Sequence, residues 1–217
     1  MQEFKAVLFD VDGTLLDTSE FIFQAYEHTL NKYSLPLKNR SEIAGLIGKP
    51  LEFCYRILAP DADVKELSQT HRAFQAEHLN LSKPYPGANE TLDKLKSAGF
   101  KIAAVTTRSR PTTVRTLELA GLSVYIDYVV ALEDVEHLKP HPEPLLKALN
   151  YLDVEPKYSV MTGDTDVDIQ AGKNAGATTI GVTYGFHGLG IASSNPDYII
   201  NSIKEIIPIV THEFKLA

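Results

Sequence analysis

Two aspartates stand two residues apart near the start of the chain, at Asp10 and Asp12, and Gly13 and Thr14 follow them directly. The apolar run at residues 6–9 predicts a buried strand in front of them. If that strand ends near Asp10, its carboxylate leaves the sheet at the carboxyl edge, where open α/β sheets bind their ligands. Asp, Gly and Thr are also ordinary turn residues, so the interpretation depends on further motifs along the chain.

Polar residues follow three other predicted strands in the same way. They are Thr106 and Thr107 after a strand at 101–105, Lys139 after one at 128–132, and Asp164 and Asp168 after one at 158–162. If these strands are parallel neighbours, their carboxyl ends meet at one edge of the sheet. We therefore expect four aspartates, a threonine hydroxyl and the lysine to converge there.

Carboxylates packed together repel one another unless protons or a metal ion neutralise them. A hard divalent cation with oxygen ligands is the simplest answer. Mg²⁺ fits best, because it takes few carboxylates and keeps waters for a substrate phosphate. The seven histidines are scattered and show no His/Cys cluster with the spacing of a zinc site. The sequence therefore predicts Mg²⁺ as the cofactor.

A carboxylate beside Mg²⁺ can act as a covalent nucleophile toward phosphorus. The ion screens the repulsion between carboxylate and phosphate, while a lysine and a hydroxyl hold the transferring oxygens. A second carboxylate can protonate the leaving oxygen and then activate water. The motifs thus favour phosphoryl transfer from a small phosphorylated substrate.

Composition narrows the class of partner. The net charge of −7 over 217 residues argues against a general binder of nucleic acid or of anionic membranes. The single cysteine, Cys54, excludes an internal disulfide, and its aromatic neighbours predict a buried thiol. Neither a signal peptide nor a long apolar run is visible, so we expect a cytoplasmic protein without a membrane segment. The sequence leaves the oligomeric state open.

The elements fall into two groups. Apolar periodicity predicts helices at about 19–33, 41–46, 50–58 and 63–79, and nothing between 19 and 82 resembles a strand. Two prolines and a glycine at 83–87 then mark a hinge or boundary. Beyond it, predicted strands at 101–105, 128–132, 158–162, 178–182 and 197–200 alternate with predicted helices.

This alternation predicts an α/β fold, with a Rossmann-like, mostly parallel sheet covered by helices on both faces. The strand at 6–9 most simply belongs to the same sheet. We therefore expect a catalytic core domain at 1–15 and 85–217, with an all-helical cap domain inserted at 16–84.

The chain resembles the haloacid dehalogenase superfamily of phosphotransferases in the order and spacing of its motifs. These are Asp10-Val11-Asp12-Gly13-Thr14-Leu15, Thr106, Lys139-Pro140 and Gly163-Asp164-Thr165-x-x-Asp168. The resemblance implies that Asp10 is the nucleophile and a Mg²⁺ ligand. It implies that Asp12 is the general acid/base and binds the metal through its backbone carbonyl, and that Lys139 stabilises the nucleophile and the phosphoryl charge.

The same resemblance assigns the remaining motif residues. Asp164 ligates Mg²⁺, and Asp168 supports the metal site. Thr106 binds the phosphoryl oxygens, and Thr107 stands beside it as a second substrate-binding residue where many members carry Asn. The Lys139-Pro140 bond could be cis and aim the lysine inward.

Within the superfamily the chain looks like the phosphoglycolate phosphatase branch and its bacterial pyrophosphatases. The implied activity is hydrolysis of a phosphoglycolate-like metabolite or of pyrophosphate, and the alternative is a sugar phosphomutase. A receiver-type signalling domain is disfavoured because it is about half this length and has no cap, and a halide-releasing enzyme because it needs no metal site. Residues whose roles stay open are Tyr26, Lys49 and Tyr55 in the cap, and Arg108, Asp166 and His187 in the core.

Overall fold

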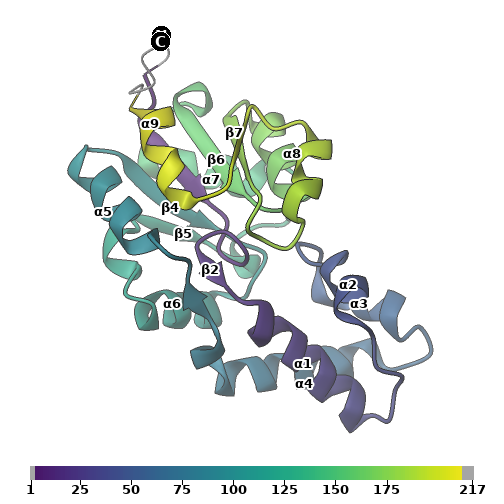
Figure 1. Ribbon diagram of the computed structural model, residues 1–217. Helices are drawn as coiled ribbons and strands as arrows, with labels where there is room; N and C mark the ends of the chain where they lie inside the picture. Colours follow the sequence, from purple (N-terminus) through teal and green to yellow (C-terminus); the bar gives the residue numbers. More distant parts are fainter. Residues whose placement is uncertain (1–2, 212–217) are drawn as a thin grey trace.

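The computed structural model describes residues 3–211, and its centre is a six-stranded parallel sheet (Figure 1). The strands are β1 (Ala6–Phe9), β4 (Lys101–Val105), β5 (Tyr128–Val130), β6 (Ser159–Gly163), β7 (Thr178–Val182) and β8 (Tyr198–Ile200). Their order in the sheet is β5-β4-β1-β6-β7-β8. After β1 the chain therefore forms β4 and β5 on one side of it, and then β6, β7 and β8 on the other side. The neighbouring loops after β1, β4 and β6 consequently lie at the point where the strand order reverses, which is where such sheets bind ligands.

β1 is buried on both faces, which explains its uninterrupted apolar run. It pairs with β4 and β6 in parallel, so that Phe9 is level with Ala104 and Thr162. Val7 and Phe9 pack into one hydrophobic cluster, and the alternate residues Ala6 and Leu8 pack into the other. The prediction that the first strand belongs to the main sheet is confirmed.

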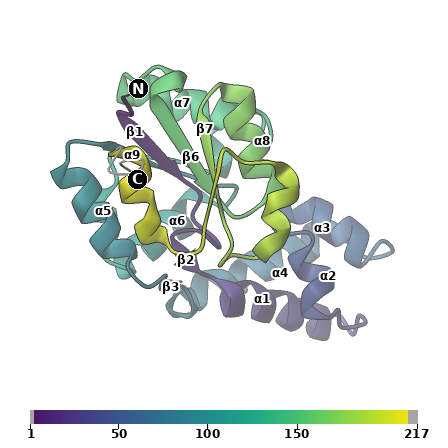
Figure 2. The same ribbon diagram turned by 45° about the horizontal axis from the view of Figure 1, so that its top comes forward.

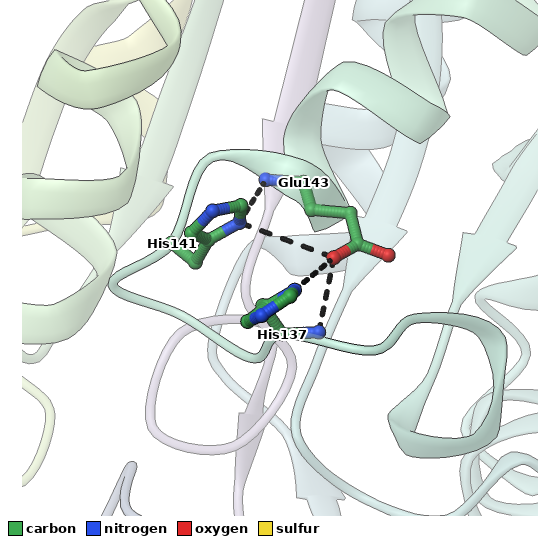
Figure 3. A group of neighbouring side chains, drawn as sticks. All are labelled: His137, His141 and Glu143. Atoms are coloured by element: carbon green, nitrogen blue, oxygen red, sulfur yellow. Dashed lines mark hydrogen bonds and ion pairs between the residues drawn. The ribbon is translucent and has the colours of Figure 1, made fainter.

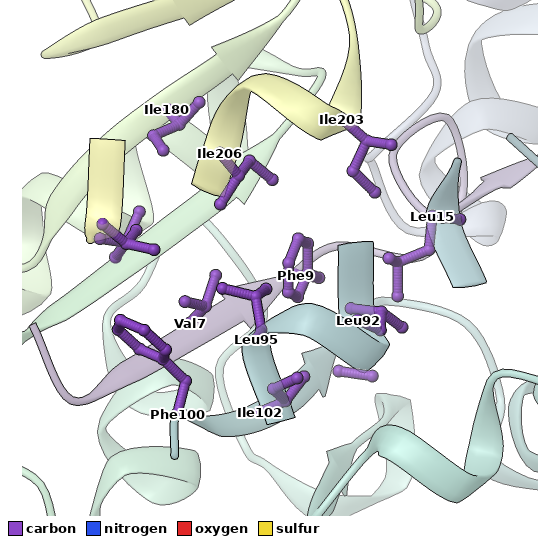
Figure 4. Packing of buried hydrophobic residues seen from close by; sticks show 14 of the residues in the cluster. Val7, Phe9, Leu15, Leu92, Leu95, Phe100, Ile102, Ile180, Ile203 and Ile206 are labelled. Atoms are coloured by element: carbon purple, nitrogen blue, oxygen red, sulfur yellow. The ribbon is translucent and has the colours of Figure 1, made fainter. Parts of the chain in front are cut away.

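Helices cover the two faces of the sheet. On one face, α5 (Ala88–Ser97) lies beside α9 (Ile206–Val210), and their leucines and isoleucines cover Val7 and Phe9 (Figure 4). α6 (Arg110–Leu119) contributes Leu117 to the same cluster. On the other face lie α7 (Glu143–Leu152) and α8 (Asp166–Ala175). This arrangement confirms the predicted α/β fold class.

Four helices form a separate block beyond the carboxyl end of β1 (Figure 2). They are α1 (Ser19–Lys32), α2 (Arg40–Ala44), α3 (Leu51–Leu58) and α4 (Val64–Glu77). The block has its own hydrophobic core, which includes Tyr26, Leu30, Tyr55 and Leu67. Cys54 lies in this core as a buried free thiol, as predicted.

Two short strands connect the block to the sheet. β2 (Leu16–Asp17) and β3 (Lys83–Pro84) form an antiparallel pair in which Leu16 faces Pro84. The Tyr85 N–H donates to the Leu15 carbonyl oxygen at 3.0 Å and extends this contact. The outgoing and returning chains therefore run side by side. The sequence indicated a boundary at 83–87 but not this pairing.

One predicted strand end differs from the structure. The strand predicted at 128–132 ends at Val130, because residues 132–134 form a helical turn, η3 (Leu132–Asp134). The Asp134 carboxylate accepts the N–H of Ala131 at 2.7 Å and closes that turn. The part of the predicted core at 1–2 and 212–217 lies outside the described residues. Within 3–211, no helix is long and apolar enough to cross a membrane.

Candidate active site

Asp10 continues the line of β1 into the carboxyl edge of the sheet. Its N–H donates to the Thr162 carbonyl oxygen at 2.9 Å, which holds its backbone against β6. The residue is 7% exposed. Burial raises the pKa of Asp10 to about 7, against the opposing effect of the Lys139 charge. The structure thus places one buried, strongly perturbed carboxyl group where the first sequence motif predicted a site.

Lys139 reaches this carboxyl group from the loop between η3 and α7. Its Nζ donates to Asp10 Oδ1 at 2.6 Å, to Asp168 Oδ1 at 2.6 Å and to the Val105 carbonyl oxygen at 2.9 Å. All three donors of the ammonium group are therefore used. Burial alone would lower the pKa of Lys139, but the charges of Asp10 and Asp168 raise it above its ordinary value. The Lys139–Pro140 bond is cis.

Asp164 and Asp168 come from β6 and α8. Asp164 follows β6 and accepts the Phe186 N–H at 2.7 Å and the Thr14 hydroxyl at 3.5 Å. Asp168 Oδ2 accepts the N–H and the hydroxyl of Thr165, at 3.1 and 2.6 Å. Since Asp168 Oδ1 holds Lys139, both oxygens of this carboxylate are occupied by protein donors.

Two glycines make room for Asp164. A Cβ at Gly13, whose φ is +84°, would stand 2.3 Å from Asp164 Oδ2. A Cβ at Gly185 would stand 2.3 Å from Asp164 Cβ. The Gly13 conformation is also one that residues with a Cβ rarely adopt. The glycine of the first motif is therefore needed for close approach as well as for its backbone angle.

Three buried carboxylates gather at this edge of the sheet, and Lys139 contacts two of them. Oxygens of Asp10, Asp164 and Asp168 lie within 4.8 Å of one another, and all three residues are buried. Burial, together with the charges of Asp168 and Asp10, raises the pKa of Asp164 well above its ordinary value. Among the described residues no cation is hydrogen-bonded to Asp164. The site carries surplus negative charge on oxygen ligands, and this donor set fits a hard divalent cation.

The side chain of Asp12 points to a different partner. Its Oδ1 accepts from the Arg108 guanidinium at 3.1 Å, and 17% of the Asp12 side chain is exposed. Arg108 is buried and also donates to Thr116 Oγ1 at 2.8 Å. The ring of Phe21 in α1 lies 4.1 Å from the guanidinium. Arg108, whose role the sequence left open, thus connects Asp12, α6 and the helical block.

Thr106 and Thr107 follow β4 beside this pair. Thr106 is buried, and its hydroxyl oxygen accepts the Arg108 N–H at 3.1 Å. Thr107 is half-buried. Both line the cavity described next. Both threonines therefore share a cavity wall with Asp10 and Lys139, and their contact with substrate stays a prediction.

A cavity of about 130 Å³ lies between the sheet edge and the helical block. Its core-side walls include Asp10, Asp12, Thr106, Thr107, Arg108, Lys139 and Asp168, and its block-side walls include Phe21, Tyr26, Lys49, Arg72 and Gln75. Tyr26 and Lys49, two of the cap residues whose roles the sequence left open, therefore line the cavity.

Other candidates lie elsewhere. Tyr55 is fully buried in the helical core, where its hydroxyl pairs with His71 Nδ1 at 2.9 Å. Asp166 is exposed in the first turn of α8, and His187 is half-buried outside the cavity lining. Arg72 lines the cavity and pairs with Glu52 at 2.6 Å. No motif or periodicity identified Arg72, because only the packing of α3 against α4 turns it toward the cavity.

The comparisons with known proteins agree with this fold. A family model described as haloacid dehalogenase-like hydrolase matches residues 7–182. The chain therefore belongs to the haloacid dehalogenase-like hydrolase family. It is 40% identical to the pyrophosphatase PpaX of Halalkalibacterium halodurans over 96% of this chain and 97% of the relative.

Two solved structures are similar over most of the chain. A haloacid dehalogenase-like hydrolase from Bacteroides fragilis aligns with a TM-score of 0.86 at 28% identity, over 94% of this chain and 100% of the other. A predicted phosphoglycolate phosphatase from Haemophilus somnus aligns with a TM-score of 0.88 at 26% identity, over 96% and 99%. The protein is therefore a hydrolase whose similar proteins include phosphatases.

Proposed function

We propose that this hydrolase is a Mg²⁺-dependent phosphatase that cleaves pyrophosphate or a small phosphate monoester through an aspartyl-phosphate intermediate on Asp10. The observation that supports this most strongly is the buried Asp10 carboxylate at the cavity wall, 2.6 Å from Lys139 Nζ and grouped with Asp164. A buried carboxylate held in place by a cation is oriented for attack on a phosphorus atom in that cavity.

Asp10, Asp164 and the backbone carbonyl of Asp12 would hold the metal ion. Asp168 is better suited to support, because both of its oxygens already bind Lys139 and Thr165. When bound, Mg²⁺ would neutralise the surplus charge and lower the repulsion between Asp10 and a substrate phosphate. The proposed role of Asp168 is then to fix the position of Lys139.

Lys139 and Thr106 would serve the transferring phosphoryl group. Lys139 stabilises the charge of Asp10 in the resting site, and the same ammonium group can stabilise the oxygens of a phosphoryl group bound there. The Thr106 hydroxyl, whose oxygen accepts the Arg108 N–H, still has its own O–H to donate in the cavity wall. Thr107, next in the chain and also in the cavity wall, is the second proposed contact.

Asp12 is the proposed general acid/base. It lines the cavity, and its carboxylate is held by Arg108 at 3.1 Å rather than by Lys139. In the first step it would give a proton to the leaving oxygen, and in the second it would take one from the attacking water. Its partial exposure leaves it reachable by both.

We also propose that residues 16–84 act as a cap domain over the core at 1–15 and 85–217. The block has its own hydrophobic core and is joined to the sheet through the paired strands β2 and β3. Such a connection permits the block to close over the cavity and to exclude water. Lys49 and Arg72 line the cavity from the block, where their positive charge suits the far phosphate of pyrophosphate.

The relatives favour pyrophosphate as the substrate, because the 40% identical protein is a pyrophosphatase. A phosphoglycolate-like monoester is the alternative monophosphate substrate. A sugar phosphomutase would share the chemistry up to the phosphorylated aspartate and differ only in the fate of that intermediate.

The test is phosphate release from pyrophosphate, phosphoglycolate, β-glucose 1-phosphate and an aryl phosphate, each with Mg²⁺ and with EDTA. Asp10→Asn is compared with Asp166→Asn, which changes an exposed aspartate outside the cavity. We expect Mg²⁺-dependent release that disappears in Asp10→Asn and persists in Asp166→Asn. Equal release by the two variants would overturn the proposal, and glucose 6-phosphate without free phosphate would favour the mutase.

A further inference from the structure

A second group of metal-type ligands lies on the outer side of the loop that carries Lys139. His137, His141 and Glu143 come together there at the start of α7 (Figure 3). The Glu143 Oε2 atom is 3.0 Å from His137 Nδ1 and 3.9 Å from His141 Nδ1. The sequence analysis found the histidines scattered, and the structure brings two of them beside a glutamate because the loop folds back on itself.

Backbone contacts hold this group together. The Glu143 carboxylate accepts the N–H groups of Glu136 at 2.9 Å and of His137 at 3.0 Å. These donors, first that of Glu136, hold the pKa of Glu143 below its ordinary value, so the carboxylate is ionised. The His141 N–H donates to the Leu138 carbonyl oxygen at 3.0 Å and closes the turn that returns the chain. The carboxylate and the turn are thus fixed by the main chain.

The distances match a transition-metal site. With metal–ligand bonds of 2.0–2.1 Å, tetrahedral geometry places two ligand atoms about 3.3 Å apart. The two measured separations from Glu143 Oε2, 3.0 and 3.9 Å, lie on either side of that value. The side chains of His137, His141 and Glu143 are 62%, 50% and 31% exposed. Three protein ligands with an open fourth position are typical of zinc sites that keep a water.

The ligand type separates this group from the acidic site. Imidazole nitrogen suits zinc, copper and nickel, whereas Mg²⁺ prefers oxygen ligands. The acidic site offers carboxylates alone, and this group offers two imidazoles and one carboxylate. The two sites are therefore expected to take different ions.

We propose that His137, His141 and Glu143 form a binding site for one divalent ion of the zinc class. The ion takes the place of the hydrogen between His137 Nδ1 and Glu143 Oε2, and the neutral His137 ring then carries its proton on Nε2. It also takes the Nδ1 lone pair of His141 from the Glu143 N–H, which now donates to it at 3.2 Å. Because Lys139 stands between the two histidines in the chain, the ion cross-links the loop on either side of that lysine.

The test is calorimetric titration of the metal-free protein with Zn²⁺ in excess Mg²⁺, which occupies the acidic site. Wild type is compared with His137→Gln and His141→Gln, with His187→Gln as the control histidine. We expect one Zn²⁺ per chain in wild type, an affinity at least tenfold lower in the first two variants, and no change in His187→Gln. The same Zn²⁺ should bind to Asp164→Asn, whose acidic site is impaired.

Two further readouts separate binding from folding. Zn²⁺ should raise the unfolding temperature of wild type and of Asp164→Asn, but not of His137→Gln. In wild type, it should shift the NMR signals of two histidine rings and leave the other five unchanged. Binding that is lost in Asp164→Asn, or kept at full affinity in the double variant His137→Gln/His141→Gln, would overturn the proposal. Neither readout depends on the phosphatase activity.

Discussion

Replacing Lys139 with methionine tests how strongly its charge stabilises the buried carboxylates of the site. The variant keeps a long, unbranched side chain but removes the ammonium group between Asp10 and Asp168, which stands 2.6 Å from each. It also leaves the Val105 carbonyl oxygen without its donor. Removing one partner of a buried ion pair costs about 3–5 kcal/mol, because it leaves an uncompensated buried charge. We expect a loss of that size in the free energy of unfolding at pH 7.

The assay is urea denaturation in EDTA, so that no metal ion substitutes for the lysine. Lys157→Met is the control, because Lys157 is 57% exposed and its contacts with Glu155 and with the Tyr158 ring lie at the surface. We expect no measurable change in that variant.

The loss of stability in Lys139→Met should also change with pH in a definite direction. In the folded protein the pKa of Asp10 is raised from 3.8 to about 7, so the folded state binds the proton more tightly than the unfolded chain. Between these values the free energy of unfolding therefore rises as the pH falls. Without Lys139, which lowers this pKa, the effect grows, and the deficit of the variant should shrink toward pH 5. A loss under about 1 kcal/mol at pH 7, or a deficit that widens on acidification, would refute the reasoning.

Three further predictions follow from the same contacts. Gly13→Ala should lose activity, and circular dichroism melting should show a larger loss of stability than in Gly99→Ala. The Cβ at Gly13 would stand 2.3 Å from Asp164, whereas a Cβ at Gly99, which has a similar φ, has nothing within 4 Å. Equal losses of stability in the two variants would contradict the close-approach argument. Arg108→Met should lower kcat and leave KM nearly unchanged, because Asp12 loses the guanidinium that holds it at 3.1 Å. The exposed Arg115→Met is the control. An unchanged kcat would show that Arg108 does not position Asp12 for catalysis. Burial lowers the pKa of His71 from 6.5 to about 3, so the unfolded chain takes up the proton first and stability falls as the pH drops between these values. At about 1.4 kcal/mol per pH unit, His71 alone contributes a loss of up to about 2 kcal/mol by pH 5, which opposes the gain from Asp10. In urea titrations His71→Gln should therefore gain stability relative to wild type as the pH falls from 6.5 to 5; an unchanged difference between the two would sink this assignment.

Periodicity and strand-end motifs predicted the fold because they depend on local sequence. The buried run at β1 and the alternation beyond residue 100 are properties of short windows, and parallel connections then bring Asp10, Asp164 and Lys139 to one edge. The predicted placement of these residues therefore needed only the order of the strands.

Contacts between distant loops were harder to predict. Arg108 and Asp12 are 96 residues apart, and nothing in either loop identifies the other as its partner. The pairing of β2 with β3 depends on the geometry with which the helical block leaves the sheet. Tyr55 is the opposite case, a residue that sequence position suggested as a substrate contact but that the structure buries in the helical core. Position alone could not separate the two roles, because an aromatic residue near the cavity can equally fill the core behind it.

The central claim is that Asp10 carries the phosphoryl group, and acid quenching during turnover tests it most directly. The enzyme is mixed with pyrophosphate and Mg²⁺, quenched in acid within milliseconds, digested and analysed by mass spectrometry. We expect the mass of one phosphoryl group on the peptide that contains Asp10, and its absence in Asp10→Asn and in samples quenched after the substrate is consumed. Turnover with no phosphorylated peptide at any quench time, or a phosphoryl group on another residue, would contradict the account.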